Sequence, residues 1–506
     1  MLAWIIFAAY LIAVAIIGYY GAKRTKTIAD FVAASGQLGF WTYSLLMIGS
    51  VFSGMTLIGV AGLAFTTGWA NMWERIIGPA FAIAFGTILI GNKLYKVKTN
   101  GILTIQDYLA FRYNDPKLMR IIAGGISALT CYIYLIGQYT AVGVASYIIL
   151  GIPYWLGATI AAVIVVSYVM SGGMFSTAWT TFLQSLLMML GIYLTVPLIV
   201  MGVGGFEQMN IALSNMPQLQ NETRGVAPNY MFAEYLSKPF APANVPLAGW
   251  IYNITLFFIT VPLGLMVAPH IVNNMLTFKD RSYIRWSPLV MYVIGVSIIL
   301  LTALAGMAAR VAWAQGTLNI TDLDLEGTKV KWSDMAYPAA AQKFLPEWLF
   351  LLLLPTILAG VMSTTDRLIL TAANNISYDI LKNATGREIS EKRFKILNAI
   401  LVAFIGFSSL LLALTPQQML AWIIWSGLGL MANCFFFPIF LGLYWSRMTR
   451  NAARLSMILG LVVTLICFAI YGKTITVSGI PIYAAFPGFV ASFLTAVIVS
   501  PIERKD

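Results

Sequence analysis

Long apolar runs recur throughout this 506-residue chain, and they constrain its fold more than any other feature. A helix needs about 20 mostly apolar residues to cross a hydrocarbon layer about 30 Å thick, because each residue adds only about 1.5 Å. Backbone groups inside a bilayer must also be satisfied within the segment, which favours helices. The expected fold class is therefore an all-α polytopic membrane protein with about 13 transmembrane helices. The expected spans are residues 2–21, 41–65, 72–92, 119–149, 154–172, 179–203, 249–278, 286–310, 347–381, 394–415, 417–446, 453–472 and 485–502.

The charge pattern indicates the orientation of these spans. The chain is 59% hydrophobic and only 10% charged, so its net charge of +12 does not indicate nucleic-acid binding. Most Lys and Arg residues lie in alternate short connections, and basic connections face the cytoplasm in most membrane proteins. We therefore expect a multi-pass protein of the cell membrane with its N-terminus outside and its C-terminus in the cytoplasm. An odd number of spans is required, and thirteen satisfies this.

One apolar span contains an unusual group of polar residues. Between Leu349 and Tyr378 the sequence places Ser363, Thr364, Thr365, Asp366 and Arg367 consecutively, with apolar residues on both sides. Charged side chains at this depth cost several kcal/mol unless they face a partner or a cavity. This group is therefore the first candidate for a functional site.

Two spans contain residues that interrupt helices. The second span contains the segment Gly49–Gly54 (GSVFSG), and the seventh contains Thr260–Gly264 (TVPLG). The two spans are five apart, so they cross the membrane in opposite directions and each begins a block of five helices. Interrupted spans at corresponding positions of two inverted halves are typical of secondary transporters, whose substrate site lies near the bilayer midplane. We expect a break within each segment.

Seven short segments, in order along the chain, resemble the sodium/solute symporter family. They are ADFVAASGQLGFW (29–41), the SxxSG core of the second span, LTIQDY (103–108), YVMSGGMFSTAWTTFLQ (168–184), APHIVNNMLTFKD (268–280), GVMSTTDRLILTAANNISYDIL (360–381) and LGLYWSRMTRNAARLSMILG (441–460). The resemblance implies a five-plus-five inverted repeat with broken helices. Its parts would be a first helix and cytoplasmic linker (1–40), a first repeat (41–203), an outer loop (204–248), a second repeat (249–446), and two final helices with a short cytoplasmic tail (447–506).

The resemblance also implies a sodium site. The matching residues are Gly49, Phe52 and Gly360, which would offer backbone carbonyls, and Ser363 and Thr364, which would offer hydroxyls. Carbonyls released by a helix break suit a small hard cation where water is scarce. The alternative is that the two hydroxyls only hydrogen-bond back to their own helix.

This chain departs from the family pattern next to that site. Many members have an acidic residue where this chain has Val51, and another where it has Thr181. Asp366 and Arg367 stand where relatives with a second sodium site have hydroxyls. Asp366 could replace the missing carboxylate, Arg367 could take the place of a cation, or Asp366 could be protonated and make the carrier proton-coupled. The pair could also be only structural.

The substrate site is less clear from the sequence. Glu74 and Arg75 form a second charged pair, and Arg75 could hold a substrate carboxylate. Gln138 stands where sialic acid relatives have an arginine, which argues against a sialate clamp. Val261 and Leu265 stand where proline symporters have aromatic contacts, which argues against proline. The candidate substrate-binding residues are Ser53, Glu74, Arg75, Gln138, Val261 and Leu265.

The expected function is sodium-coupled symport of a small carboxylate or zwitterion, such as pantothenate, a monocarboxylate or an amino acid, into the cell. Sodium would be co-transported, and the partners would be the solute and the lipid bilayer, with no nucleic acid and with a monomer sufficient. No catalytic constellation is present in the sequence, so an enzyme is not expected. The alternatives are a proton-coupled or cation-independent carrier, and a transporter-like membrane sensor.

Overall fold

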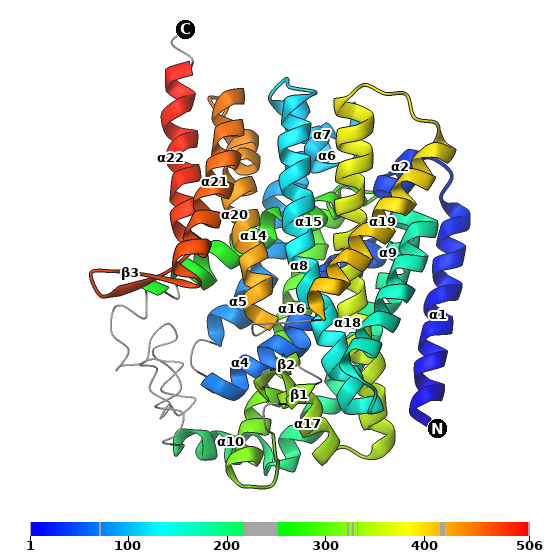
Figure 1. The fold of residues 1–506 in the computed structure, drawn as a ribbon, viewed down its shortest axis with the longest axis vertical. Coiled ribbons are helices and arrows are strands. Elements are labelled where there is room, and N and C mark those ends of the chain that lie inside the picture. Colours follow the sequence, from blue (N-terminus) through cyan, green and yellow to red (C-terminus); the bar gives the residue numbers. More distant parts are fainter. Residues whose placement is uncertain are drawn as a thin grey trace.

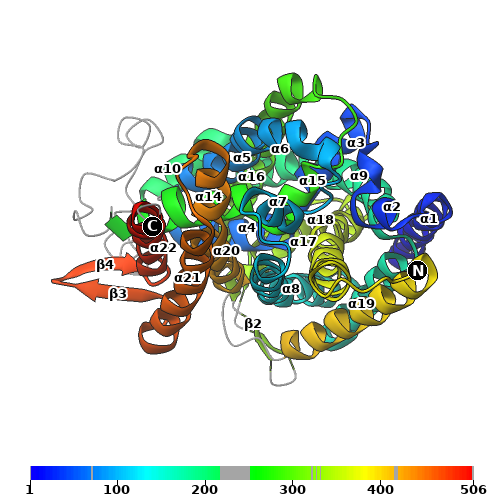
Figure 2. The ribbon, with the colours of Figure 1, turned by 90° about the horizontal axis from the view of Figure 1, so that it is seen from above.

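The protein is a bundle of long helices in the computed structural model (Figure 1). The structure describes residues 2–69, 72–216, 251–252, 254–320, 323–325, 328–330, 332–414 and 420–503. Figures 1 and 2 show most of the long helices running roughly parallel, with the N and C termini at opposite ends of the bundle. This arrangement agrees with an odd number of crossings.

The helices have the following bounds: α1 (Leu2–Arg24), α2 (Ile28–Ala33), α3 (Phe40–Val51), α4 (Val60–Thr67), α5 (Trp73–Gly86), α6 (Asn92–Val97), α7 (Ile105–Arg112), α8 (Leu118–Leu150), α9 (Tyr154–Gly202), α10 (Gly205–Ser214), α14 (Val261–Val267), α15 (Pro269–Asn274), α16 (Tyr283–Ala314), α17 (Ala336–Phe344), α18 (Glu347–Asn374), α19 (Glu391–Ala413), α20 (Leu420–Tyr444), α21 (Arg450–Tyr471) and α22 (Phe486–Glu503). Four wider π-helical segments are η2 (Met55–Gly59), η3 (Thr87–Gly91), η5 (Ile254–Thr260) and η7 (Asn375–Ala384). Three short 3₁₀ turns are η1 (Ala34–Gly36), η4 (Lys98–Asn100) and η6 (Trp332–Met335).

Ten helices of the described chain are long and apolar enough to cross a membrane, or eleven if the bent pair of α3 with η2 and α4 counts as one span. The expected number of thirteen is not confirmed. The difference falls on two places. Helix α9 has 49 residues, about 74 Å at the usual rise, and turns at Gly173, whose φ is +53°. The segment Ile254–Val267 is apolar but shorter than a full span.

Helix α18, which carries the polar group expected from the sequence, is the most enclosed span. Of its most apolar stretch, 89% is buried inside the protein, against 28% for α1 and 22% for α22. Figure 2 shows α18 between α8, α9 and α19, and it packs against α8, α9 and α1. Its Asp366 and Arg367 therefore face protein and not lipid, as expected for functional groups inside a membrane.

The break in the second span lies where the sequence indicated. Helix α3 ends at Val51, Phe52 has an extended backbone (φ −87°, ψ 104°), and the chain resumes as η2 and α4. The two halves are bent by 54°. Gly54 fits here because an added Cβ would lie 2.5 Å from the Cβ of Ala141 on α8.

The break in the seventh span lies later than expected, so its predicted position at Thr260–Gly264 was wrong. Thr260 is helical, and η5 continues directly into α14, where Pro262 occupies one of the first two positions. Pro262 lies directly after the wider π-helical turn of η5, and the chain passes it without leaving helical geometry. The chain leaves helical geometry at Ala268 (ψ 126°), immediately before Pro269. A proline disfavours helical geometry in the residue before it, which explains the observed position.

Gly264 lets α14 lie directly against α20. An added Cβ at Gly264 would lie 2.2 Å from the backbone oxygen of Leu428. We expect Gly264→Ala to push these helices apart and to lower the free energy of unfolding by about 3 kcal/mol, the upper end of the usual cost of overpacking. Thermal unfolding in detergent measures this. The control is Gly125→Ala on α8, where an added Cβ meets nothing within 4 Å, and an equal loss in both variants would contradict the argument.

The connections add short elements that an all-α prediction omits. Strands β1 (Leu323–Leu325) and β2 (Thr328–Val330) form one antiparallel hairpin, and β3 (Thr474–Val477) and β4 (Ile480–Tyr483) form another. The segment predicted as an outer loop after α9 contains α10, and most of the rest of it lies outside the described residues.

Candidate functional site

Two hydroxyls of α18 reach across to the broken second span. Ser363 Oγ donates hydrogen bonds to the backbone oxygens of Gly49, at 2.8 Å, and Gly360, at 3.0 Å. Thr364 Oγ1 donates to the same Gly49 oxygen at 3.0 Å. The side chains of Ser363 and Thr364 are fully buried. The alternative in which the hydroxyls bond only to their own helix accounts for the contact with Gly360 but not for the two contacts with Gly49.

The sequence around Gly49 makes this close approach possible. An added Cβ at Gly49 would lie 2.5 Å from Ser185 Oγ and 2.6 Å from Thr181 Cγ2, so only glycine fits between α9 and α18. Three residues later, the extended backbone of Phe52 turns its carbonyl away from the helical direction of α3. The structure thus gathers four of the five sodium-ligand candidates at one place, with Phe52 at the adjoining break.

The donor set suits a hard monovalent cation. It consists of carbonyl and hydroxyl oxygens without charge, and such oxygens can satisfy sodium where water is excluded. In the described part of the chain, no group of three or more His, Cys, Asp or Glu residues is placed to hold a metal ion. The arrangement is chemically suited to reversible binding of a monovalent cation.

Asp366 and Arg367 form a buried ion pair one helical turn further along α18. Arg367 Nε lies 3.2 Å from Asp366 Oδ1, and the two side chains are 2% and 0% exposed, respectively. The other carboxylate oxygen of Asp366 accepts hydrogen bonds from Tyr168 (3.1 Å) and Thr181 (3.4 Å), both on α9. An Arg367 guanidinium nitrogen also contacts the Met174 sulfur. The carboxylate is thus paired and hydrogen-bonded on both oxygens.

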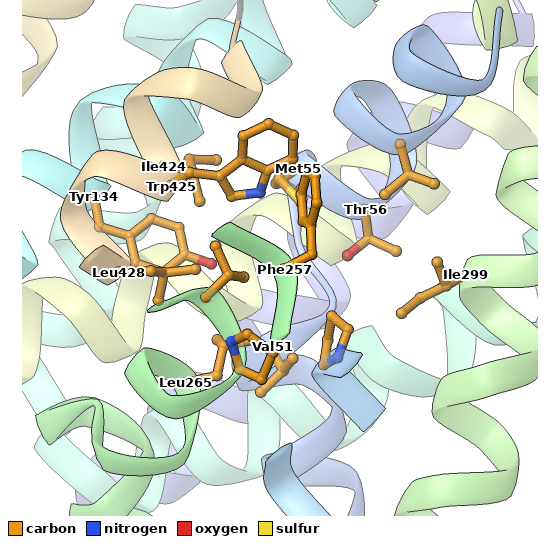
Figure 3. A pocket seen from close by; sticks show the side chains of 14 residues that line it. Val51, Met55, Thr56, Tyr134, Phe257, Leu265, Ile299, Ile424, Trp425 and Leu428 are labelled. Atoms are coloured by element: carbon orange, nitrogen blue, oxygen red, sulfur yellow. The ribbon is translucent and has the colours of Figure 1, made fainter. Parts of the chain in front are cut away.

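A mostly apolar cavity lies next to the broken span, which contributes Val51, Met55 and Thr56 to its wall (Figure 3). Its volume is about 30 Å³ in this conformation, room for only one or two water molecules, so its walls must move apart to admit a solute. Figure 3 shows the rings of Tyr134, Phe257 and Trp425 around one space, together with Met55 and Thr56 from η2. The lining residues are Val51, Met55, Thr56, Val60, Pro79, Tyr134, Phe257, Val261, Pro262, Leu265, Ile299, Ile424, Trp425 and Leu428.

The predicted substrate residues divide into three groups. Val261 and Leu265 line the cavity. Ser53 and Gln138 lie at the break beside it: Gly54 N donates to Gln138 Oε1 at 3.3 Å, and Met55 N donates to Ser53 Oγ at 3.3 Å. Glu74 and Arg75 belong to the first turn of α5, but their side chains lie outside the described residues.

Sequence reasoning missed the aromatic wall and the hydrogen-bond donors to Asp366. Trp425 and Phe257 come from apolar spans in which nothing distinguishes them from lipid-facing aromatics. Tyr168 opens a segment recognised for its resemblance, but no sequence pattern connects it to Asp366. These contacts arise only when α9, η5 and α20 are placed around α3 and α18.

Comparison with known proteins agrees with this arrangement. The chain is 26% identical over 511 residues to a sodium/proline symporter of Salmonella typhimurium, covering 98% of this chain and 92% of the relative. It is 25% identical to the osmoregulated proline transporter OpuE of Bacillus subtilis, covering 98% and 94%. A solved sodium-coupled sialic acid symporter in a substrate-bound outward-open state superposes with a TM-score of 0.74 at 16% identity, covering 99% and 98% of the two chains.

Residues 31–460 match the sodium:solute symporter family. This match includes the broken second span, the hydroxyl pair of α18 and all the residues that line the cavity. The chain therefore belongs to the sodium:solute symporter family and is a membrane protein that couples sodium to the transport of a small solute.

Proposed function

We propose that this symporter carries proline, or a closely related small zwitterion, into the cell together with one sodium ion. The observation that carries this proposal is that one broken helix contributes residues both to the candidate sodium site and to the cavity. Its Gly49 carbonyl meets the hydroxyls of α18, and its residues Val51, Met55 and Thr56 line the solute cavity. Sodium bound at the first place orders the backbone that forms part of the second.

This shared element explains coupling. A ligand that favours one conformation of a segment raises the affinity of any second ligand that needs the same conformation, and the effect is reciprocal. Sodium bound to Gly49, Gly360, Ser363 and Thr364 holds α3 against α18. The solute then meets a cavity wall that is already ordered on the side of the broken helix, and the doubly occupied protein opens to the other side.

The cavity suits a solute with an apolar ring. The wall is apolar, with Tyr134, Phe257 and Trp425 contributing aromatic surface. These rings remove the argument against proline from Val261 and Leu265, because aromatic contacts come from other positions. The charged ends of a zwitterion would meet the amide of Gln138 and the polar groups of the break near Ser53 and Gly54. The proline symporters among the relatives support the same solute class.

The chain architecture follows the transporter arrangement. The two repeats are 41–203 and 249–446, and each has its break in its first span, at Phe52 and at Ala268. Thirteen spans result if α9 crosses twice and the segment from Ile254 crosses once. The end that carries the basic connections faces the cytoplasm, and a single copy contains the whole pathway.

Arg367 acts as a built-in cation beside the sodium site. Its guanidinium already neutralises Asp366, whose second oxygen is held by Tyr168 and Thr181. A second sodium at this carboxylate would place two positive charges around one negative charge without water. The proposed stoichiometry is therefore one sodium per solute.

Uptake into proteoliposomes tests the function. We expect a sodium gradient to drive accumulation of labelled proline, and a proton gradient alone not to do so. Unlabelled pantothenate and short monocarboxylates should compete weakly. Uptake driven by protons alone would contradict sodium coupling. Sodium-driven uptake of another solute but not proline would contradict only the solute. Solute binding without any transport would instead favour the sensor alternative.

The aromatic wall gives a separate prediction. We expect Trp425→Ala to raise the KM for proline at least about tenfold, because removing a buried aromatic contact costs roughly 1.5–3 kcal/mol. Sodium-dependent stabilisation in the absence of solute should not change, because Trp425 is not among the oxygen donors. The control is Trp286→Ala, an exposed tryptophan of α16. An unchanged KM in the Trp425 variant would place the solute elsewhere.

A further inference from the structure

A second buried charge cluster lies at the end of the bundle opposite the N-terminus. It joins Asp107 of α7, Arg120 of α8 and Asp379 of η7, and Figure 1 places α7 at the same end as the C-terminus. One guanidinium nitrogen of Arg120 contacts Asp107 Oδ1 and lies 3.6 Å from Asp379 Oδ1. Two carboxylates therefore share one positive charge.

The two carboxylates are not equally satisfied. Asp107 Oδ2 accepts hydrogen bonds from the backbone N–H groups of Leu103 (2.9 Å) and Thr104 (3.1 Å) and from the Tyr378 hydroxyl (3.3 Å). Asp379 Oδ1 accepts one bond, from the Thr104 hydroxyl at 2.7 Å. Asp379 Oδ2 is buried and has no hydrogen-bond partner among the described residues. The Asp379 side chain is 0% exposed.

The surroundings of Asp379 do not supply a second positive charge. From α19, packed on another side of η7, Asn398 reaches Ser377 and Phe394 lies against the Tyr378 ring, and both are uncharged. On η7 itself, the Lys382 ammonium lies over the Tyr378 ring and contacts Asn383. Asp107 of α7 and Arg120 of α8 are thus the charged groups that the described contacts place against Asp379.

We propose that Asp379 is a proton-binding site of this transporter, occupied when this end of the molecule is closed. Two ionised carboxylates and one guanidinium would leave one net negative charge in a water-poor interior, which is strongly unfavourable. One proton on Asp379 removes that charge. It also leaves the unpaired Oδ2 uncharged, and burying an unpaired neutral oxygen costs less than burying an unpaired charged one.

The position of the cluster gives the proton a role. Helix α7 also bonds to α15, where Ile105 N donates to Asn273 Oδ1 at 2.9 Å, and Arg112 donates to the Gly442 carbonyl at the end of α20. The Thr104–Asp379 bond therefore holds η7 to α7. Helix α7 is in turn bonded to α15, which follows the break in the seventh span, and to the end of α20. When Asp379 loses its proton, its carboxylate becomes charged and is more stable in contact with water. Deprotonation therefore favours opening of the bundle at this end. Alkaline solution at this end should shift the equilibrium toward the open form by up to about tenfold per pH unit.

Infrared spectroscopy of the purified full-length protein tests the proton directly and does not depend on which solute is carried. We expect a carbonyl-stretch band of a protonated carboxyl group near neutral pH that is lost in Asp379→Asn. Asp107→Asn should also abolish it, because Arg120 then has one carboxylate to neutralise and Asp379 becomes ionised. The control, Asp280→Asn, changes an exposed carboxylate and should leave the band intact.

Three results would overturn the proposal. They are a spectrum unchanged by Asp379→Asn, a band that survives in Asp107→Asn, and a band lost on adding sodium at constant pH, which would make the site a sodium site.

Solute counterflow gives a second readout with external pH fixed and internal pH set at about 6 or about 8. The wild type should respond to this change and Asp379→Asn should not, while equal responses would contradict the proposed role.

Discussion

Replacing both Ser363 and Thr364 by alanine should abolish sodium-driven uptake at ordinary sodium concentrations. Each hydroxyl is a buried oxygen beside the Gly49 carbonyl, and a hydrogen-bond-like contact to a charged group contributes about 1.5–3 kcal/mol. Losing two such contacts should weaken sodium binding by at least about 100-fold. The measurement is the initial rate of proline uptake as a function of sodium concentration.

The neighbouring Thr365 provides a matched control. Its hydroxyl donates to the Val361 carbonyl of its own helix at 2.8 Å, so Thr365→Ala should leave the sodium dependence nearly unchanged. Ser363→Thr and Thr364→Ser keep the hydroxyls and should retain much of the activity. If the double variant needed no more sodium than the wild type, the oxygen donors of α18 would not bind the ion.

Replacing Arg367 by methionine should strongly destabilise the protein. The substitution keeps most of the side-chain volume but leaves the Asp366 carboxylate buried without its positive partner. Breaking a buried ion pair in this way costs about 3–5 kcal/mol. Thermal unfolding in detergent should therefore show a large fall in Tm, or the variant should fail to accumulate.

A double variant distinguishes lost charge pairing from lost packing. Asp366→Asn combined with Arg367→Met leaves no unpaired charge, so it should recover much of the stability that the single Arg367 variant loses. High sodium, but not high potassium, should also stabilise the single variant, because the freed carboxylate lies beside a cation site. If the double variant were as unstable as the single one, Arg367 would stabilise the protein through packing. The proposal that its charge takes the place of a second cation would then be wrong.

The residues of the candidate cation site were predicted from the resemblance to the sodium/solute symporter family. The break in the second span was also indicated by glycine and serine in the middle of an apolar run. The structure brings Gly49, Gly360, Ser363 and Thr364 together. Burial of the Asp366–Arg367 pair also followed from the cost of charges in lipid.

The remaining features depend on how the helices pack. The seventh-span break lies at Ala268 and not at Thr260–Gly264, because the helix context makes Pro262 harmless and Pro269 disruptive. The solute cavity depends on rings from three separate spans, and sequence periodicity does not distinguish cavity-facing from lipid-facing aromatics. The connection between Asp107 and Asp379 joins residues 272 positions apart through Arg120.

The most direct test of the account is a simultaneous measurement of sodium and proline fluxes in proteoliposomes. With radioactive sodium and labelled proline under a fixed membrane potential, we expect one sodium ion to enter with each proline. Both fluxes should be lost together in the Ser363→Ala, Thr364→Ala variant. A ratio of two would show that Arg367 does not take the place of a second cation. Proline flux with no accompanying sodium would contradict the central claim that the broken helix couples the two ligands.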